Sequence, residues 1–195
     1  MIDNQVSDSG GGCTYSHVER HYSHAQEFIN NLPYITMIAL GAVVLAAAFG
    51  RSALGWTLTS LYVAYGIVGA LWIIVFLCPY CRYYGTRSCP CGYGSIAARL
   101  RDRKPGNRFN EKFKQHIPVI VPLWFIPAIA ALPFLVKGFS WFLLVMAVLF
   151  ALDAFLVLPL VSTKHGCKDC PQRDSCPWMA ARAKAKSKTE DSVHR

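Results

Sequence analysis

Four long apolar stretches, separated by polar segments, dominate the pattern of hydrophobic and polar positions along the chain. They cover residues 34–50, 54–77, 117–136 and 139–161. In a helix that rises 1.5 Å per residue, about 20 apolar residues cross the ~30 Å hydrocarbon core of a bilayer. The first stretch is short by this measure, and we expect its helix to begin earlier, within residues 28–32. The pattern predicts an all-α membrane protein whose four transmembrane helices form two hairpins, residues 34–77 and 117–161.

Prolines interrupt the third apolar stretch at four positions: Pro118, Pro122, Pro127 and Pro133. In a soluble protein this density would argue against a helix, because proline lacks the N–H that a helix requires. Membrane helices tolerate proline when neighbouring groups hydrogen-bond the freed carbonyls. We therefore expect a kinked third helix.

Composition agrees with the membrane assignment. Of the 195 residues, 53% are hydrophobic and 16% are charged, whereas soluble domains usually carry roughly a quarter charged residues. A disordered chain would need a much lower hydrophobic content. Composition therefore excludes a disordered chain and disfavours an ordinary soluble domain.

The basic residues are distributed unevenly around the apolar stretches. Of the 20 lysines and arginines, nine lie in residues 82–114 and eight in residues 164–195, whereas the two short connections contain only Arg51 and Lys137. Positively charged loops remain cytoplasmic, so we expect a multi-pass protein of the cytoplasmic (inner) membrane with both termini inside. The same rule accounts for the net charge of +9 without a nucleic-acid partner, and we expect none.

Three polar segments complete the expected organisation. Residues 1–33 form a cytoplasmic N-terminal segment with an amphipathic helix that lies along the membrane surface. One face of that helix would carry Cys13, His17, His21 and His24. Residues 78–116 form a cysteine-rich basic loop, and residues 162–195 form a cysteine-rich basic tail.

Seven of the eight cysteines fall into two groups, each directly after a predicted hairpin. The first group is Cys78, Cys81, Cys89 and Cys91, and the second is Cys167, Cys170 and Cys176. Both groups open with a C-x-x-C motif and precede a basic run, which is consistent with a parallel duplication of one unit. Cytoplasmic thiols stay reduced, so metal binding or redox chemistry is expected in place of disulfides. Together the two groups predict a cysteine-rich cytoplasmic cap.

The number of cysteines predicts two metal sites, because a tetrahedral thiolate site needs four ligands. The first group supplies four ligands by itself, whereas the second has Trp178 where the first has Cys91. Cys13 is the candidate fourth ligand of the second site, with His165 as the alternative. The eight cysteines then form two sites with no thiol left over.

Sites with four cysteines hold either zinc or an iron–sulfur cluster. A proline follows four of the cysteines, as it follows the last ligand in bacterial ferredoxin motifs, although the spacings here differ from the ferredoxin run. Both groups also begin at the membrane surface, at the depth of quinone head groups. We therefore expect two [4Fe–4S] clusters, with two zinc ions as the alternative cofactors.

Asp153 is the only acidic residue inside the apolar stretches. An ionisable residue at this depth is costly to insert and usually faces the interior of the helix bundle. Equal depth along the other helices places Trp124, Tyr65 and Thr36 within reach of it. Two interpretations stay open: a proton or quinone site, or a carboxyl group whose hydrogen bond only fixes packing.

These features predict a membrane-anchoring, electron-transferring subunit of a larger redox complex, not itself a catalyst. Its expected partners are the other subunits, a soluble donor or acceptor on the cytoplasmic face, the lipid bilayer and a quinone as candidate membrane acceptor. The alternative is a structural membrane scaffold whose two four-cysteine zinc sites dock cytoplasmic partners.

Overall fold

The computed structural model describes residues 21–50, 52–167, 170, 172, 176, 177 and 179. Within these residues the chain is helical and contains no strand. The candidate ligand Cys13 and the first 20 residues lie outside the described part. Four helical stretches of the described chain are long and apolar enough to cross a membrane: His24–Phe49, Ala53–Tyr80, Gly106–Lys137 and Trp141–Gly166. The prediction of an all-helical, multi-pass membrane protein is therefore confirmed.

Only the first of these stretches is a single regular helix, α1 (His24–Phe49). The second comprises α2 (Ala53–Phe76) and the 3₁₀ helix η1 (Cys78–Tyr80). The third comprises the 3₁₀ helix η2 (Gly106–Arg108), α4 (Phe109–His116), the 3₁₀ helix η3 (Ile117–Val119) and α5 (Pro122–Lys137). The fourth comprises α6 (Trp141–Leu152), the π-helix η4 (Asp153–Val157), α7 (Leu158–Val161) and the π-helix η5 (Ser162–Gly166). The short helix α3 (Tyr93–Leu100) lies between the second and third stretches.

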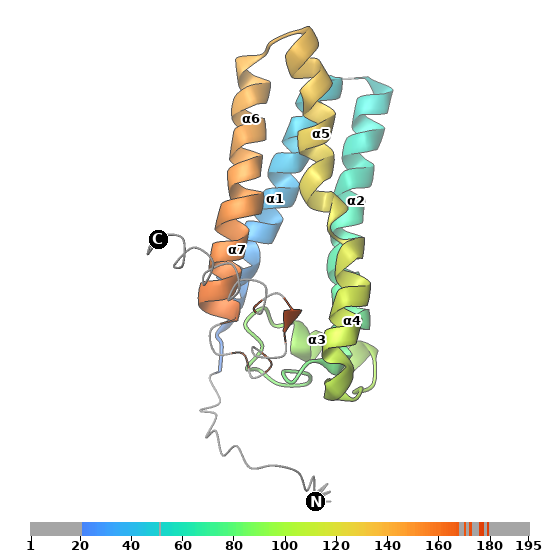
Figure 1. Cartoon of the computed structure of the whole chain (residues 1–195), viewed down its shortest axis with the longest axis vertical. Coiled ribbons are helices and arrows are strands. Elements are labelled where there is room, and N and C mark those ends of the chain that lie inside the picture. The colour runs from blue at the N-terminus through green and yellow to red at the C-terminus, as the bar shows by residue number, and fades with distance from the viewer. Residues whose placement is uncertain are drawn as a thin grey trace, which may run out of the picture.

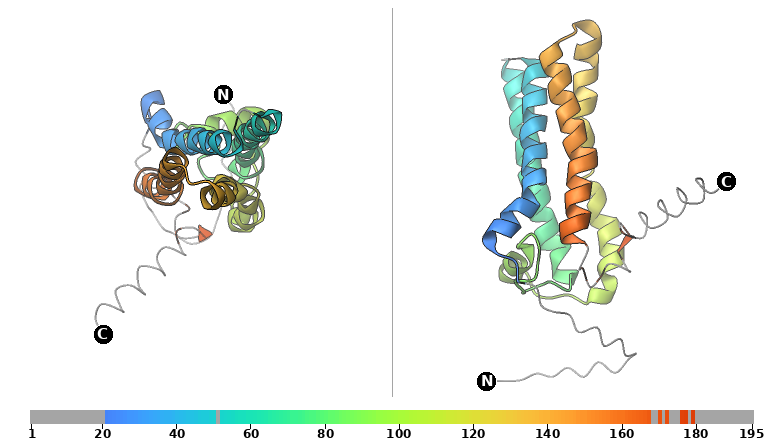
Figure 2. Two further views of the ribbon diagram at one scale, coloured as in Figure 1. Left: turned by 90° about the horizontal axis from the view of Figure 1, so that it is seen from above. Right: turned by 90° about the vertical axis from the view of Figure 1, so that its left-hand side faces the viewer.

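Helix α1 packs against α2, α5 and α6. Seen from above, α1 and α2 form one side of the bundle, and α5 and α6 lie against it (Figure 2). The connections from α1 to α2 and from α5 to α6 lie at one end of the bundle, whereas α3 lies at the opposite end, where α2 and α7 finish (Figure 1). One end therefore carries two short connections, and the other carries the polar segment between α2 and α4.

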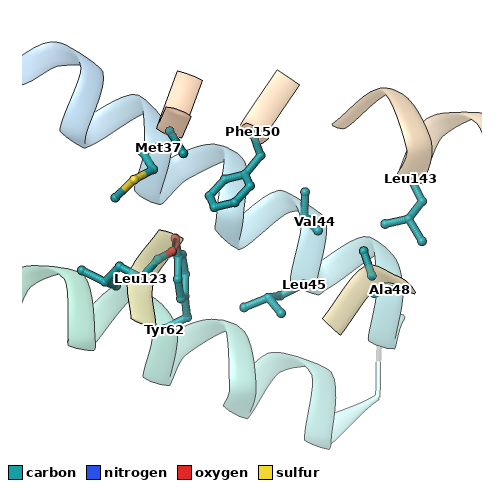
Figure 3. Packing of buried hydrophobic residues seen from close by; sticks show 10 residues of the cluster. Met37, Val44, Leu45, Ala48, Tyr62, Leu123, Leu143 and Phe150 are labelled. Carbon is teal, nitrogen blue, oxygen red and sulfur yellow. Dashed lines mark hydrogen bonds between the residues drawn. The ribbon is translucent and has the colours of Figure 1, made fainter. Parts of the chain in front are cut away.

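The interior of the bundle is filled by side chains from all four stretches. Met37, Val44 and Phe150 are fully buried and lie close together (Figure 3). Two glycines allow α1 and α2 to approach each other: Gly41 lies against the Tyr62 ring, and a Cβ at Gly66 would be 2.5 Å from Ile38 Cδ1. Small residues have this role in membrane helices, where packing replaces the hydrophobic effect. Many large apolar side chains remain exposed on the outside of the bundle, where lipid would cover them.

The third stretch is kinked, as its prolines predict. Regular α-helix stops at His116, a 3₁₀ turn follows, and α5 begins at Pro122. Two tyrosines of α2 hydrogen-bond carbonyls at this break: the Tyr65 hydroxyl donates to the carbonyl of Val119, and the Tyr62 hydroxyl donates to that of Leu123 at 3.1 Å. In a regular helix the Leu123 carbonyl would accept from the N–H of residue 127, but Pro127 has no N–H. The neighbouring helix therefore satisfies a carbonyl that proline leaves unbonded.

Helix α1 begins at His24, ahead of the first apolar stretch. Ser23 caps it through a reciprocal pair of bonds with Gln26, whose backbone N–H donates to Ser23 Oγ at 3.3 Å and whose Oε1 accepts from the Ser23 N–H at 3.0 Å. Such a capping box satisfies two otherwise unpaired N–H groups. His21 precedes the cap, so it does not share a helical face with His24. The first turns of α1 lean away from the rest of the helix, ahead of the buried Pro33 (Figure 2).

Candidate metal centre

The described cysteines lie directly after the membrane-spanning stretches. Cys78 opens η1 immediately after α2, and Cys167 follows η5 at the end of the fourth stretch. Cys89 and Cys91 precede α3, which packs against α2 and η1. All seven described cysteines are partly buried.

Gln172 joins the two cysteine segments. Its side chain is buried, with 6% of the residue exposed. Its Oε1 accepts from the Arg82 backbone N–H at 3.1 Å, and its Nε2 donates to the Tyr80 carbonyl at 3.3 Å. These two partners flank Cys81, and Gln172 itself follows Cys170 by two residues. The amide therefore holds the C-x-x-C motif of the second segment against that of the first.

Tyr22, just before α1, also contacts both segments. Its backbone N–H donates to the Arg87 carbonyl at 3.3 Å, and its hydroxyl donates to the His165 carbonyl at 3.4 Å. His165, the alternative fourth ligand, lies in η5 and is exposed. The N-terminal segment therefore reaches both cysteine segments at Tyr22, nine residues after Cys13.

The first turns of α1 hold the segment around Cys91. Asn30 Nδ2 donates to the Pro90 carbonyl at 2.8 Å, and Asn31 Nδ2 donates to the Cys91 carbonyl at 3.1 Å. Gly92 has a φ of 73°, and a Cβ at this position would lie 3.0 Å from the Glu27 carboxylate. A side chain here would be strained by its backbone conformation as well as by this contact.

Burial controls the protonation of the thiols. It raises the pKa of Cys81 to about 12, while a hydrogen bond from the backbone of Tyr83 acts in the opposite direction. It also raises the pKa of Cys91 to about 12 and raises the pKa of Cys170. The thiolate is the form that binds metal, so loading a metal here must displace these protons.

Thiols of the two segments lie close enough to raise one another's pKa. After burial, the thiols that raise the pKa of Cys81 are those of Cys170, Cys89 and Cys176. Cys91 lies near Cys89 and also near Cys167 of the second segment. Cys78 lies near Cys81, Cys89 and Cys91. Among the residues described, no three His, Cys, Asp or Glu side chains are arranged closely enough to hold a metal ion. The donor set nevertheless suits a soft metal or an iron–sulfur cluster, because it consists of thiols.

The segment between α2 and α4, which carries the first cysteine group, is rich in basic residues. Six of them are exposed: Arg82, Arg87, Arg99, Arg101, Arg103 and Lys104. The Arg101 guanidinium lies 5.7 Å from the centre of the Phe76 ring, at the end of α2. These positions give the cysteine-bearing end of the bundle a positive surface.

Asp153 is buried within the fourth stretch, with 7% of the residue exposed. It begins the π-helix η4, and its Oδ2 has no hydrogen-bond partner among the described residues. Of the neighbours expected from sequence, Tyr65 donates to a backbone carbonyl, and Trp124 Nε1 is likewise buried without a partner in the described part. A single turn of π-helix frequently marks a functional site.

Sequence reasoning did not find the polar residues that organise the cysteines: Tyr22, Asn30, Asn31 and Gln172. Nothing in the local pattern distinguishes Gln172 from other polar residues of the tail. The consecutive asparagines before the first apolar stretch are a weak signal of contacts at the membrane surface. Their partners are backbone carbonyls about 60 residues away in sequence, which no local pattern encodes.

Comparison with known proteins assigns the chain to no family. The chain matched no family model, no curated protein and no solved structure. What the site binds must therefore be inferred from its own residues and geometry.

Proposed function

We propose that the protein is a membrane-anchoring electron-transfer subunit of a redox complex, with two [4Fe–4S] clusters on the cytoplasmic side. The single observation that supports this is the grouping of seven cysteines from two distant segments. The membrane part consists of two hairpins, and the cysteine segments with their basic residues form a cytoplasmic cap. Both termini are then cytoplasmic, in agreement with the positive-inside rule.

The donor set favours iron–sulfur clusters over other metals. All seven described members of the group are thiols, and Cys13 or His165 supplies the eighth ligand. Four thiolates per cluster is the usual ligation of [4Fe–4S], and burial of the sulfur ligands tunes the potential of such a cluster. A cluster in this position supplies one-electron transfer at the membrane surface, while the protein supplies the ligands, the burial and the surface charge.

The exposed arginines and Lys104 suggest the partner on the soluble side. Positive charge around a redox site accelerates encounter with an acidic protein and orients it. We therefore propose an acidic soluble donor or acceptor, bound beside Arg82 and Arg87. On the membrane side, the unpartnered carboxyl oxygen of Asp153 is the candidate contact for a quinone or a proton.

Metal and sulfide analysis of one anaerobically purified sample tests this proposal. We expect about eight iron and about eight acid-labile sulfide per chain, since each cubane contributes four of both. About two zinc per chain, without iron or sulfide, would overturn the redox function.

A zinc-stapled scaffold is the second candidate, and the Gln172 and Tyr22 contacts favour it. These contacts join three separate segments into one unit, which is the usual role of a structural zinc site. The scaffold would dock cytoplasmic partners on the basic surface. The same metal analysis decides between the two candidates.

A further inference from the structure

The third and fourth membrane-spanning stretches part at Asp153. Helices α5 and α6 pack against each other, but α6 ends at Leu152. Beyond it, η4 and α7 pack against α1, whereas α4 packs against α2 (Figure 1). The buried Asp153 opens η4, so it lies where the two stretches separate on their way to the cysteine-bearing end.

Two phenylalanines meet across this junction. Phe125 of α5 and Phe155 of η4 have ring centroids 5.5 Å apart. Both are about half exposed, at 44% and 50%, on the outside of the bundle where lipid would cover them. Trp124 directly precedes Phe125, and Asp153 precedes Phe155 by two residues. The ring contact therefore places Trp124 and the start of η4 at the same depth in the bundle.

Two buried polar atoms at this depth have no hydrogen-bond partner in the part of the chain that the structure describes: Trp124 Nε1 and Asp153 Oδ2. The indole N–H can only donate, whereas an ionised carboxylate can only accept. A bond between them would satisfy both, and the described structure has none. Leaving a buried donor or acceptor unpaired is costly, so the two atoms suit a ligand that brings one acceptor and one donor.

The π-helix adds a backbone acceptor beside the carboxyl group. In a regular helix the Ala154 carbonyl would accept from the Leu158 N–H, but that N–H donates to the carbonyl of Asp153. The next residue, Pro159, has no N–H. The helix therefore supplies the Ala154 carbonyl with neither of its usual donors, although the residue is buried, with 2% exposed.

These features fit a flat apolar ring that carries oxygen atoms on opposite sides. We propose that a quinone head group binds between α5 and η4 and enters from the lipid past Phe125 and Phe155. Trp124 Nε1 donates to one ring oxygen, and Asp153 Oδ2, with the Ala154 carbonyl beside it, accepts from the hydroxyl that the reduced form carries on the other. The redox role of this ligand rests on the proposed function, whereas its binding requires no metal site.

The two forms of the ligand are expected to use the site differently. The oxidised quinone has only carbonyl oxygens, so it accepts from Trp124 but offers nothing to a carboxylate. The quinol has hydroxyl groups and can also donate to Asp153. A hydrogen bond to a charged group should strengthen quinol binding by about tenfold.

Binding of a decyl-substituted 1,4-benzoquinone and of its quinol to the full-length protein in lipid nanodiscs tests the proposal, with empty nanodiscs measuring partition into lipid. Asp153→Leu should weaken quinol binding about tenfold and change quinone binding little. Trp124→Phe keeps a ring but removes the N–H, and it should weaken both forms about fivefold. If either variant bound both forms as the unsubstituted protein does, the proposal would be wrong.

Trp141→Phe is the matched control, because Trp141 is 73% exposed at the start of α6, close to the short connection from α5. This variant should bind both forms normally. Decylbenzene, which lacks the ring oxygens, should not compete with the quinone. Competition at equal concentration would show that the protein recognises only an apolar shape.

Thermal unfolding of the ligand-free protein separates binding from packing. Asp153→Leu replaces a buried carboxyl group that has no partner among the described residues, so it should raise the unfolding temperature. A lower unfolding temperature, with equal loss of quinone and quinol binding, would indicate a packing role and overturn the proposal. Should the variants fail to fold, the unsubstituted protein still decides, because absence of saturable quinone binding contradicts the site.

Metal analysis of the same samples keeps this failure distinct from failure of the proposed function. Iron and sulfide without saturable quinone binding would remove this site and leave the clusters. Saturable binding to a protein that contains zinc and no iron would keep the site and remove the electron-transfer function.

Discussion

The two cysteine segments share the C-x-x-C motif but are held in different ways. In each motif the backbone N–H of the second cysteine donates to the carbonyl of the first, at 3.0 Å for Cys81 and 3.4 Å for Cys170. Beyond this turn the first segment has a framework of its own: Gly85 N–H donates to the Gly94 carbonyl, and Gly92 N–H donates to the Cys89 carbonyl, each at 3.0 Å.

The described part of the second segment bonds to residues outside itself. In its described part, Gln172 and the His165 carbonyl bond to the first segment and to Tyr22. A repeated motif therefore does not imply a repeated structure. The first segment has a backbone framework of its own, and Gln172 holds the described part of the second segment against it.

Metal removal is expected to have the largest effect and to separate the two segments most clearly. Without metal, the first segment keeps its internal backbone bonds, whereas the described part of the second segment is held to the first by Gln172 and to Tyr22 by the His165 carbonyl. Trypsin added after chelation should therefore cleave after Lys164 well before it cleaves after Arg87. The metal-loaded protein serves as control, and equal cleavage rates at the two sites would show that the segments do not differ in this way.

Gly94→Ala is expected to disrupt the backbone framework of the first cysteine segment. A Cβ here would collide with the backbone carbonyl of Tyr83 and would lie 3.2 Å from Cys89 Cβ. Because backbone atoms cannot rotate aside, we expect a loss of about 2 kcal/mol in stability and a loss of metal from both sites. Thermal unfolding in detergent measures the first effect, and metal analysis measures the second.

The matched control for this substitution is Gly138→Ala, since a Cβ at Gly138 meets nothing within 4 Å. That variant should unfold at the temperature of the unsubstituted protein. If Gly94→Ala also unfolded at that temperature, the first cysteine segment would not be rigid.

Gln172→Ala is expected to release the second segment while leaving the first intact. It removes a buried amide and leaves the Tyr80 carbonyl and the Arg82 N–H without this partner, at a cost of roughly 1–3 kcal/mol. Hydrogen exchange should increase around Cys170 and change little within α3. Gln115→Ala is the control, because Gln115 is exposed and bonds only to Lys112 in the described structure.

Tyr22→Phe is expected to have the smallest effect. It removes only the 3.4 Å bond from the hydroxyl to the His165 carbonyl, in an exposed position, and keeps the backbone bond to Arg87. We expect a loss of about 0.5 kcal/mol and nearly unchanged metal content. A large loss of metal would show that the N-terminal segment contributes more to the second site than this contact indicates.

The membrane part of the fold follows from local pattern, which is why sequence predicts it well. The length of the apolar stretches predicts the four membrane-spanning stretches. Pro118 and Pro122 predict the break in the third of them. Small residues of α2 differ in their surroundings, since Ser60 and Ala64 are exposed whereas Gly66 and Gly69 are buried. Spacing alone does not determine which face of an apolar helix meets its neighbour.

The cysteine site is less predictable because long-range contacts define it. Its residue types are evident from sequence, and so is their preference for soft metals. Their arrangement in space depends on hydrogen bonds such as that from Gln172 to Tyr80, across 92 positions of the chain. The π-helix at Asp153 is likewise invisible to a count of apolar residues, because the inserted residue is itself part of an apolar run.

The two short connections have a consequence for sidedness. Residues 50–52 join α1 to α2, and residues 138–140 join α5 to α6, so three residues emerge at each turn. The described residues therefore present almost no polypeptide to an aqueous compartment on that side of the membrane. In the proposed function, soluble partners therefore approach the described part of the protein from the opposite compartment, and the electron acceptor on the membrane side lies in the lipid or in another subunit.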